Sequence, residues 1–262
     1  MSGTPTRTTA IYGRFNMCHQ PPDREVWLVV LEGVLPVVRP PFELFPPDPP
    51  PNTYVLVDAH SGAAFLVFPL IGPVGCEGDG TITPRTTPVQ VSGLNGVIAI
   101  TARLHHSLAL RSDGTVWAWG DNAYGQLGDG TTRNRSMPVQ VSGLSGVIAV
   151  SAGGSRSLAL RSDGTVWAWG YNSSGQLGDG TTTHRSMPVQ VSGLSGVIAF
   201  AAGGEHSLAL SSDGSVWAWG NNSSGQLIDG TTTQRSTPAR SGLSPAVGIA
   251  AGYDYSLARR AP

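Results

Sequence analysis

Residues 96–145 and 146–195 are two copies of one 50-residue sequence, with 39 of the 50 positions identical. A third copy, residues 196–245, keeps the same motifs but drifts near its end, where PVQVSGL becomes PARSGL. Partial copies flank these three, because residues 78–95 match the tail of the unit and residues 246–260 match its start. A chain of such units folds as repeated supersecondary structures that bury their apolar surfaces against one another.

Each copy contains four short strand patterns separated by turn signals. In the first copy the patterns cover residues 97–102, 107–111, 115–120 and 138–141. The Ser-Asp-Gly turn at residues 112–114 joins the second and third patterns, and Asp-Gly is the strongest short signal for a hairpin. The 35 glycines and the low charged fraction of 13% favour short strands and turns over helices.

The third strand pattern, TVWAWG in the first copy, is apolar on both faces. Strand alternation places Trp117 and Trp119 on one face. Val116 and Ala118 then lie on the other face. A sheet that is apolar on both faces must be covered on both, so neighbouring copies stack. We therefore predict an all-β fold, a β-propeller of four-stranded blades with about three to four blades in this chain.

The repeated residues also carry a family resemblance. The pattern G-V-x-A-x-A-G-G-x-x-H-S-L-A-L-x-x-D-G-x-V-W-A-W-G-x-N-x-x-G-Q-L-G-D-G resembles the regulator-of-chromosome-condensation repeat of the bacterial type, at residues 96–130, 146–180 and 196–230. The resemblance implies a seven-bladed propeller, for which three full copies are too few. Three interpretations of the shortfall stay open: a fragment, an open arc, or one part of an oligomer that closes its ring.

The N-terminal segment, residues 1–75, is a different piece of chain that holds 13 of the 20 prolines. Residues 26–31, 54–57 and 63–68 have strand patterns, and the last two flank a tight turn. This hairpin resembles the terminal hairpin of peptidase-propeptide-like (PepSY) modules, which implies at most a small accessory domain. We predict two regions, this Pro-rich β segment and the repeat region of residues 76–262.

Residues that could carry catalysis or hold a metal do not recur from copy to copy. Cys18 and Cys76 fit two unpaired thiols better than one bridge, and a zinc site joining them to His19 and His60 lacks the usual close ligand pairs. The chain contains no Lys, so a phosphate-binding P-loop cannot form, and neither a pair of carboxylates nor a Cys-His pair repeats. We expect no enzymatic activity, no cofactor and no metal site.

Two repeated residue types have structural explanations. Asp129, Asp179 and Asp229 are expected to organise turns, because the alternating acidic ligands of a calcium loop are absent. The six Trp of the repeats are expected to pack between blades rather than to stack on bases or sugars.

The first two copies differ at 11 positions, which lie in or beside residues 103–106 and 121–136 of the first copy. An up-and-down meander places both stretches on the same propeller face, opposite the invariant Ser-Asp-Gly turn. Loops on a rigid scaffold are where binding specificity resides, and Tyr and Arg are enriched in binding hot spots. Neutral drift on solvated loops is the competing explanation. The predicted partner-binding residues are Arg103, Leu104, His105, His106, Asp121, Tyr124, Arg133, Arg156, Tyr171, His184, Glu205, His206, Asn221, Tyr253 and Tyr255.

These patterns favour a non-catalytic scaffold that binds a protein partner through the variable face. The family resemblance supplies one alternative, guanine-nucleotide exchange on a small GTPase, and the Ser-, Thr- and Asn-rich loops suggest another, a surface adhesion or carbohydrate-binding module. A net charge of −1 gives no reason to expect nucleic acid, and the lack of an apolar run of about 18 residues excludes membrane insertion by a helix. Homo-oligomers that complete the ring are one possible assembly. No signal peptide is visible, and the sequence leaves the compartment undetermined.

Overall fold

The computed structural model describes residues 89–260, Gly78, Gly80 and the backbone of four earlier strands. Those strands are β1 (Thr8–Gly13), β2 (Val26–Leu31), β3 (Tyr54–Val57) and β4 (Ala64–Val67). Cys18, His19, His60 and Cys76 lie outside the described residues. In the part of the chain that is described, no helix is long and apolar enough to cross a bilayer.

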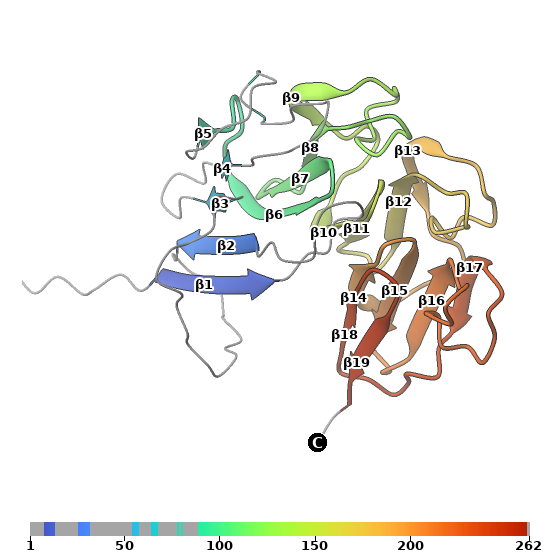
Figure 1. The fold of residues 1–262 in the computed structure, drawn as a ribbon. Coiled ribbons are helices and arrows are strands. Elements are labelled where there is room, and N and C mark those ends of the chain that lie inside the picture. The colour runs from blue at the N-terminus through green and yellow to red at the C-terminus, as the bar shows by residue number, and fades with distance from the viewer. Residues whose placement is uncertain are drawn as a thin grey trace, which may run out of the picture.

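The three full copies form three four-stranded antiparallel sheets, so the predicted all-β architecture of four-stranded blades is confirmed (Figure 1). The first blade contains β6 (Val97–Arg103), β7 (His106–Arg111), β8 (Val116–Gly120) and β9 (Arg135–Gln140). The second contains β10 (Val147–Ala152), β11 (Arg156–Arg161), β12 (Val166–Gly170) and β13 (Arg185–Gln190). The third contains β14 (Val197–Ala202), β15 (His206–Ser211), β16 (Val216–Gly220) and β17 (Arg235–Arg240).

Within each blade the strands pair in sequence order, as the meander predicts. The Ser-Asp-Gly turn sets the register of the central hairpin, in which Leu108 lies opposite Ala118 and Ala109 opposite Trp117. The outer strand is longer than its PVQV pattern indicates, because it begins at Arg135, which pairs with Gly120 across a register shift.

The two faces of each blade pack against different neighbours. Trp169 of the second blade is fully buried and belongs to one hydrophobic cluster with Leu108, Leu110 and Val116 of the first blade. The corresponding cluster one blade further is built around Trp219. Each buried indole contributes on the order of 3 kcal/mol, so stacking of blades supplies much of the stability. The prediction of packing between blades is confirmed for Trp119, Trp169 and Trp219, which are fully buried, whereas Trp117, Trp167 and Trp217 lie half-buried against the same clusters.

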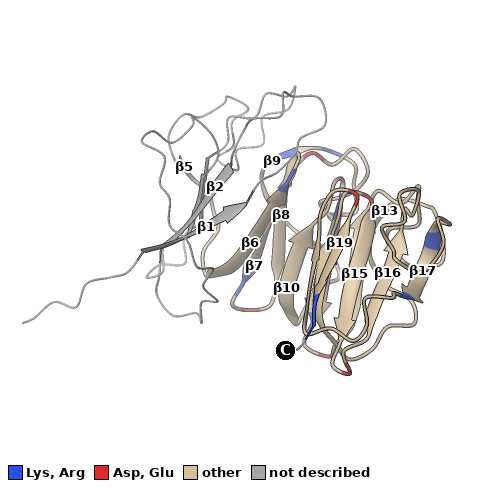
Figure 2. Ribbon diagram, turned by 60° about the horizontal axis from the view of Figure 1, so that its bottom comes forward, with Lys and Arg blue, Asp and Glu red and all other residues tan. Residues whose placement is uncertain are grey.

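The blades follow one another in an arc with the first strands innermost, since β6 contacts β10, β10 contacts β14, and β14 contacts β18 (Figure 1). The fourth, partial copy forms the two-stranded sheet β18 (Gly248–Ala251) and β19 (Ser256–Arg259). Figure 2 shows that the charged residues of the described blades lie mostly at or near the strand ends. Binding chemistry based on charge is therefore available at the two ends of the blades.

The tail of the preceding copy joins the N-terminal hairpin. Strand β5 (Val89–Gln90) pairs with β4 rather than with β18 or β19, in a sheet of order β3-β4-β5. Leu66 lies opposite Val89 and Phe65 opposite Gln90, which matches the register of Ala118 with Val139 and Trp117 with Gln140 in the first blade. Strands β3 and β4 therefore occupy the places of the second and third strands of a blade relative to β5. The small accessory domain that the resemblance implies stays a prediction.

Candidate functional site

The variable positions gather at one end of the blades, which we call the loop end. It comprises the turn of residues 103–106, the loop of residues 121–136, and their equivalents 50 and 100 residues later. One backbone hydrogen bond ties the two stretches together in every copy: the amide of Asp121 donates to His105 O at 2.7 Å, and the amide of Tyr171 to Ser155 O at 2.9 Å. The prediction that both stretches share one face is confirmed by this contact.

A glycine makes this close approach possible. Gly120, Gly170 and Gly220 have φ values of 113°, 105° and 101°, a region that L side chains rarely adopt. A Cβ atom at Gly170 would also lie 2.6 Å from the carbonyl oxygen of Ser155. The glycine that ends the TVWAWG motif is thus required for the turn and the loop to meet.

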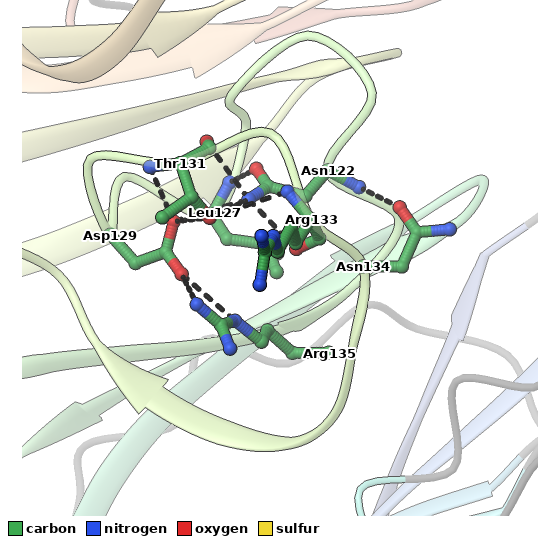
Figure 3. Close-up of polar contacts among 7 residues, drawn as sticks. All are labelled: Asn122, Leu127, Asp129, Thr131, Arg133, Asn134 and Arg135. Carbon is green, nitrogen blue, oxygen red and sulfur yellow. Dashed lines mark hydrogen bonds and ion pairs between the residues drawn. The ribbon is translucent and has the colours of Figure 1, made fainter.

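A buried asparagine organises the long loop (Figure 3). The Asn122 Nδ2 donates to the carbonyl oxygens of Thr131 and Arg133 at 3.1 and 3.0 Å, and its Oδ1 accepts the amide of Leu127 at 2.9 Å. Asn172 and Asn222 make the same set of bonds in the next two blades. A repeated, fully hydrogen-bonded asparagine therefore holds the loop backbone in one conformation.

An aspartate completes this frame. Asp129 Oδ1 accepts the Thr131 amide at 2.9 Å and hydroxyl at 2.7 Å, and Oδ2 accepts the Arg135 guanidinium at 2.9 and 2.6 Å (Figure 3). Burial alone would raise the pKa of the equivalent Asp229 carboxyl, but hydrogen bonds from Thr231 and Arg235 outweigh it and lower that pKa to about 2. The turn-organising role predicted for these aspartates is confirmed.

Each loop is also fixed to the following blade. Gly130 N donates to Ser186 O at 2.9 Å. The carbonyl oxygen of Gln126 accepts Trp169 Nε1 at 2.9 Å and Ser157 Oγ at 2.7 Å. Because hydrogen bonds fix the loop both internally and to the following blade, its variable side chains project from a rigid support.

Three predicted binding residues from two blades form an aromatic cluster. The rings of Tyr124 and Tyr171 meet edge to face with centroids 4.9 Å apart, and Tyr171 stacks on His184 at 4.9 Å. Tyr124 and His184 are exposed and Tyr171 is half-buried. His184 Nδ1 also accepts the amide of Asn172 at 2.9 Å, which fixes the ring in place.

The equivalent place one blade further is polar. Glu205 Oε2 accepts Ser174 Oγ at 3.3 Å and Asn221 Nδ2 at 3.2 Å. Ser174 is buried, whereas Glu205 and Asn221 are half-buried. Ser174 holds the position of Tyr124, and Asn221 the position of Tyr171, so the same frame presents different chemistry.

Three other predicted residues are buried between blades. His106 Nε2 lies 3.0 Å from Ser157 Oγ, and His206 Nε2 lies 3.0 Å from Ser256 Oγ. Arg156, at the same position of the second blade, donates to Ser207 Oγ at 3.3 Å, to Gly204 O at 2.7 Å and to the carbonyl oxygen of His206. These three side chains pack the blades together and leave a partner no direct access.

Desolvation dominates the titration of these buried groups. It lowers the pKa of His206 to about 3, with a smaller like-charge effect from Arg156. It lowers the pKa of His106 to about 4, although a hydrogen bond with the Arg156 backbone acts in the opposite direction. It also lowers the pKa of Arg156 to about 9, although Glu205 acts in the opposite direction. At neutral pH the two histidines are therefore uncharged while Arg156 carries its charge.

The remaining predicted residues are spread over the loop end. Arg103 Nη1 donates to Ala202 O at 2.7 Å and so spans from the first blade to the third. Leu104, at a position where the next copies have Gly, has a φ of 53°. His105, Arg133 and Tyr255 are exposed, and Asp121 and Tyr253 are half-buried.

Sequence reasoning missed the residues that build the frame. Asn122 and Gln126 stand at equivalent places in all three full copies, and this invariance beside variable neighbours is the signal that could have found them. The Gly-Gly pairs were a second signal, because a Cβ at Gly153 would lie 2.8 Å from Arg156 Nη1. The pair Gly153 and Gly154 thus leaves room for the Arg156 side chain to fold back beneath the turn.

In its described residues the molecule is a blade-stacked β-propeller repeat protein with a rigid, variable loop end. The sequence model of the RCC1-like domain family matches residues 72–258, and the chain belongs to that family. Human WBSCR16 superposes with a TM-score of 0.66 and 26% identity over 76% of this chain and 54% of that one. Prp20p of Saccharomyces cerevisiae superposes with a TM-score of 0.65 and 20% identity over 74% of this chain and 51% of that one, a likeness of fold.

A curated relative matches a shorter part of the sequence. Alsin of Homo sapiens is 45% identical over 87 residues, which cover 29% of this chain and 5% of Alsin. The chain thus spans about half the length of the two solved structures and a small fraction of Alsin.

Proposed function

We propose that the chain is a non-catalytic scaffold that binds a protein partner through the exposed residues of the loop end. The single observation that carries the proposal is the aromatic cluster of Tyr124, Tyr171 and His184. Exposed aromatic side chains on a rigid support bury large area at low entropic cost, and they are typical of binding hot spots.

Similar proteins support a protein partner. The solved Prp20p structure is described with its binding to Gsp1p and histones, and yeast Prp20 has been solved bound to Kap60. Of the predicted set, the side chains that are exposed or half-buried, and that a partner can therefore reach, are Arg103, Leu104, His105, Asp121, Tyr124, Arg133, Tyr171, His184, Glu205, Asn221, Tyr253 and Tyr255.

Site-specific photocrosslinking tests the proposal. A benzophenone amino acid replaces Tyr124 at the loop end, and as a matched control it replaces the exposed Asp163 of the Ser-Asp-Gly turn at the other end of the second blade. In lysate of the organism of origin, we expect discrete protein adducts from position 124 alone. Equal adducts from both positions, or adducts from position 163 alone, contradict the proposal.

Guanine-nucleotide exchange is the second candidate, and family membership is the observation that favours it. Release of a fluorescent nucleotide from a panel of purified small GTPases measures it directly. Acceleration that is lost on Tyr171→Ala makes exchange the function of the loop end, and no acceleration removes this candidate. Binding to a glycan array tests the carbohydrate alternative in the same way.

A further inference from the structure

The boundary between two successive blades displays the same four positions at the loop end. One position comes from the long loop of the leading blade, and three come from the turn and loop of the following blade. We define the aromatic seam, between the first and second blades, as Tyr124, Ser155, Tyr171 and His184. We define the acidic seam, between the second and third blades, as Ser174, Glu205, Asn221 and Gln234.

The backbone beneath both seams is the same. The Tyr171 amide donates to Ser155 O at 2.9 Å in one, and the Asn221 amide donates to Glu205 O at 2.9 Å in the other. The leading loops have the same asparagine frame, built on Asn122 and Asn172. The two seams therefore differ in side-chain chemistry on one geometry.

The aromatic seam suits an apolar or flat side chain. Its rings lie edge to face and stacked at 4.9 to 5.2 Å, so they support one another and lose little entropy on binding. Tyr124 is 39% exposed, which leaves ring area for a partner. An aromatic or proline side chain is the natural complement.

The acidic seam suits a cation. Both protein donors to Glu205, Ser174 Oγ and Asn221 Nδ2, contact the same oxygen, Oε2. A carboxylate accepts on both oxygens, so the half-buried Glu205 retains acceptor capacity on Oε1. Its charge is also felt by Arg156 below, where it opposes the desolvation and the like charge of Arg103, which both lower the pKa of that guanidinium. An Arg or Lys side chain from a partner fits a half-exposed carboxylate held in this way.

We propose that the two seams together recognise a protein segment that carries an aromatic or proline residue close to an Arg or Lys. This inference rests on the proposed function and deepens it, because it assigns a chemistry to each seam. The aromatic seam receives the apolar residue and the acidic seam the basic one. An acidic segment or a nucleic acid backbone is disfavoured by the Glu205 charge.

Selection of random dodecapeptides displayed on phage tests the inference on the full chain. The variants are Tyr171→Ala, Glu205→Gln and Glu205→Arg, with Asp163→Arg as a charge-matched control at the opposite end of the second blade. Thermal unfolding verifies that each variant is folded. Enriched peptides are then resynthesised, and their affinity for every variant is measured.

The wild-type chain is expected to enrich peptides in which an aromatic or proline residue lies near Arg or Lys. With Glu205→Arg the enrichment of basic residues should fall at least tenfold and acidic residues should replace them. With Tyr171→Ala the aromatic preference should be lost while the basic preference persists. Asp163→Arg should select the same peptides as the wild type.

Different failures have different meanings. Peptides that depend on Tyr171 but show no basic residue, or are unchanged by Glu205→Arg, overturn the two-seam inference and leave the proposed function standing. Enrichment of acidic peptides by the wild type also overturns it. Peptides that respond to Asp163→Arg alone, or no enrichment at all, contradict both proposals.

Discussion

Both ends of the blades connect strands, but the connections at one end are constant in sequence between the first two copies and those at the other end vary. At the turn end, Asp113 accepts the Thr115 amide and hydroxyl, and Gly114 O accepts the amide of Val147 from the next blade. These residues are the same in the first two copies.

At the loop end, invariant and variable residues alternate within one loop. The difference shows that Asn122 and Asp129, which hold the loop backbone, stay constant while neighbouring positions vary. Position 134 varies as well, although Asn134 and His184 each accept the amide of the neighbouring frame asparagine.

The largest expected effect comes from breaking the frame at the loop end. Asn172→Ala leaves the Leu177 amide and the Thr181 and Thr183 carbonyls without their side-chain partner, so we expect unfolding to become easier by about 3 kcal/mol or more. Urea unfolding measures the change. Ser173→Ala, at the exposed neighbouring position, is the control and should change stability by less than about 0.5 kcal/mol. Equal effects of the two substitutions would refute the role of the frame.

The next largest effect is expected at Arg156, which is buried at the junction between the second and third blades, beneath the loop end. Arg156→Ala should cost about 2–4 kcal/mol, because it opens a cavity and leaves the carbonyls of Gly204 and His206 without a donor. Arg156→His installs the residue that the first and third copies have at this position, and it should cost less. A greater loss with His than with Ala would show that the junctions are not equivalent.

Acid sensitivity should distinguish the junctions further. The unfolded histidine binds a proton near pH 6.5, but in the folded chain burial lowers the pKa of His106 to about 4. The unfolded chain therefore binds the proton first, and the free energy of unfolding is highest above about pH 6.5. It falls by up to about 3 kcal/mol as the pH drops toward 4. His206 acts in the same direction, whereas Arg156 stays charged throughout this range.

Unfolding free energies measured between pH 4 and pH 7 test this dependence. The double variant His106→Asn and His206→Asn should have a flatter profile than the wild type. His105→Asn removes the exposed neighbouring histidine, whose charge helps to lower the pKa of His106, and should change the profile much less than the double variant does. A flat profile in the wild type would contradict burial of neutral imidazoles at these junctions.

The repeat predicts the blade architecture, the meander and the burial of Trp169 because strand alternation and turn chemistry act locally. It also predicts that Tyr124 and Tyr171 lie at the loop end, where the structure has them. It does not separate exposed from buried positions there, since Arg156 folds back beneath its turn only where the glycines upstream leave room. The pairing of β4 with β5 could not be predicted either, because β4 lies in a segment whose sequence does not resemble the repeat to which β5 belongs.

The smallest effect on stability is expected at the variable side chains themselves. Tyr124→Ala removes a 39% exposed ring that takes no part in the hydrogen-bonded frame, so we expect a loss of less than about 1 kcal/mol. Binding should respond in the opposite order, with Tyr124→Ala reducing partner affinity more than Ser173→Ala does. Thermal unfolding and affinity measured on the same preparations test both parts. If Tyr124→Ala destabilised the chain as much as Asn172→Ala, the aromatic cluster would belong to the frame, and the distinction between constant scaffold and variable surface would fail.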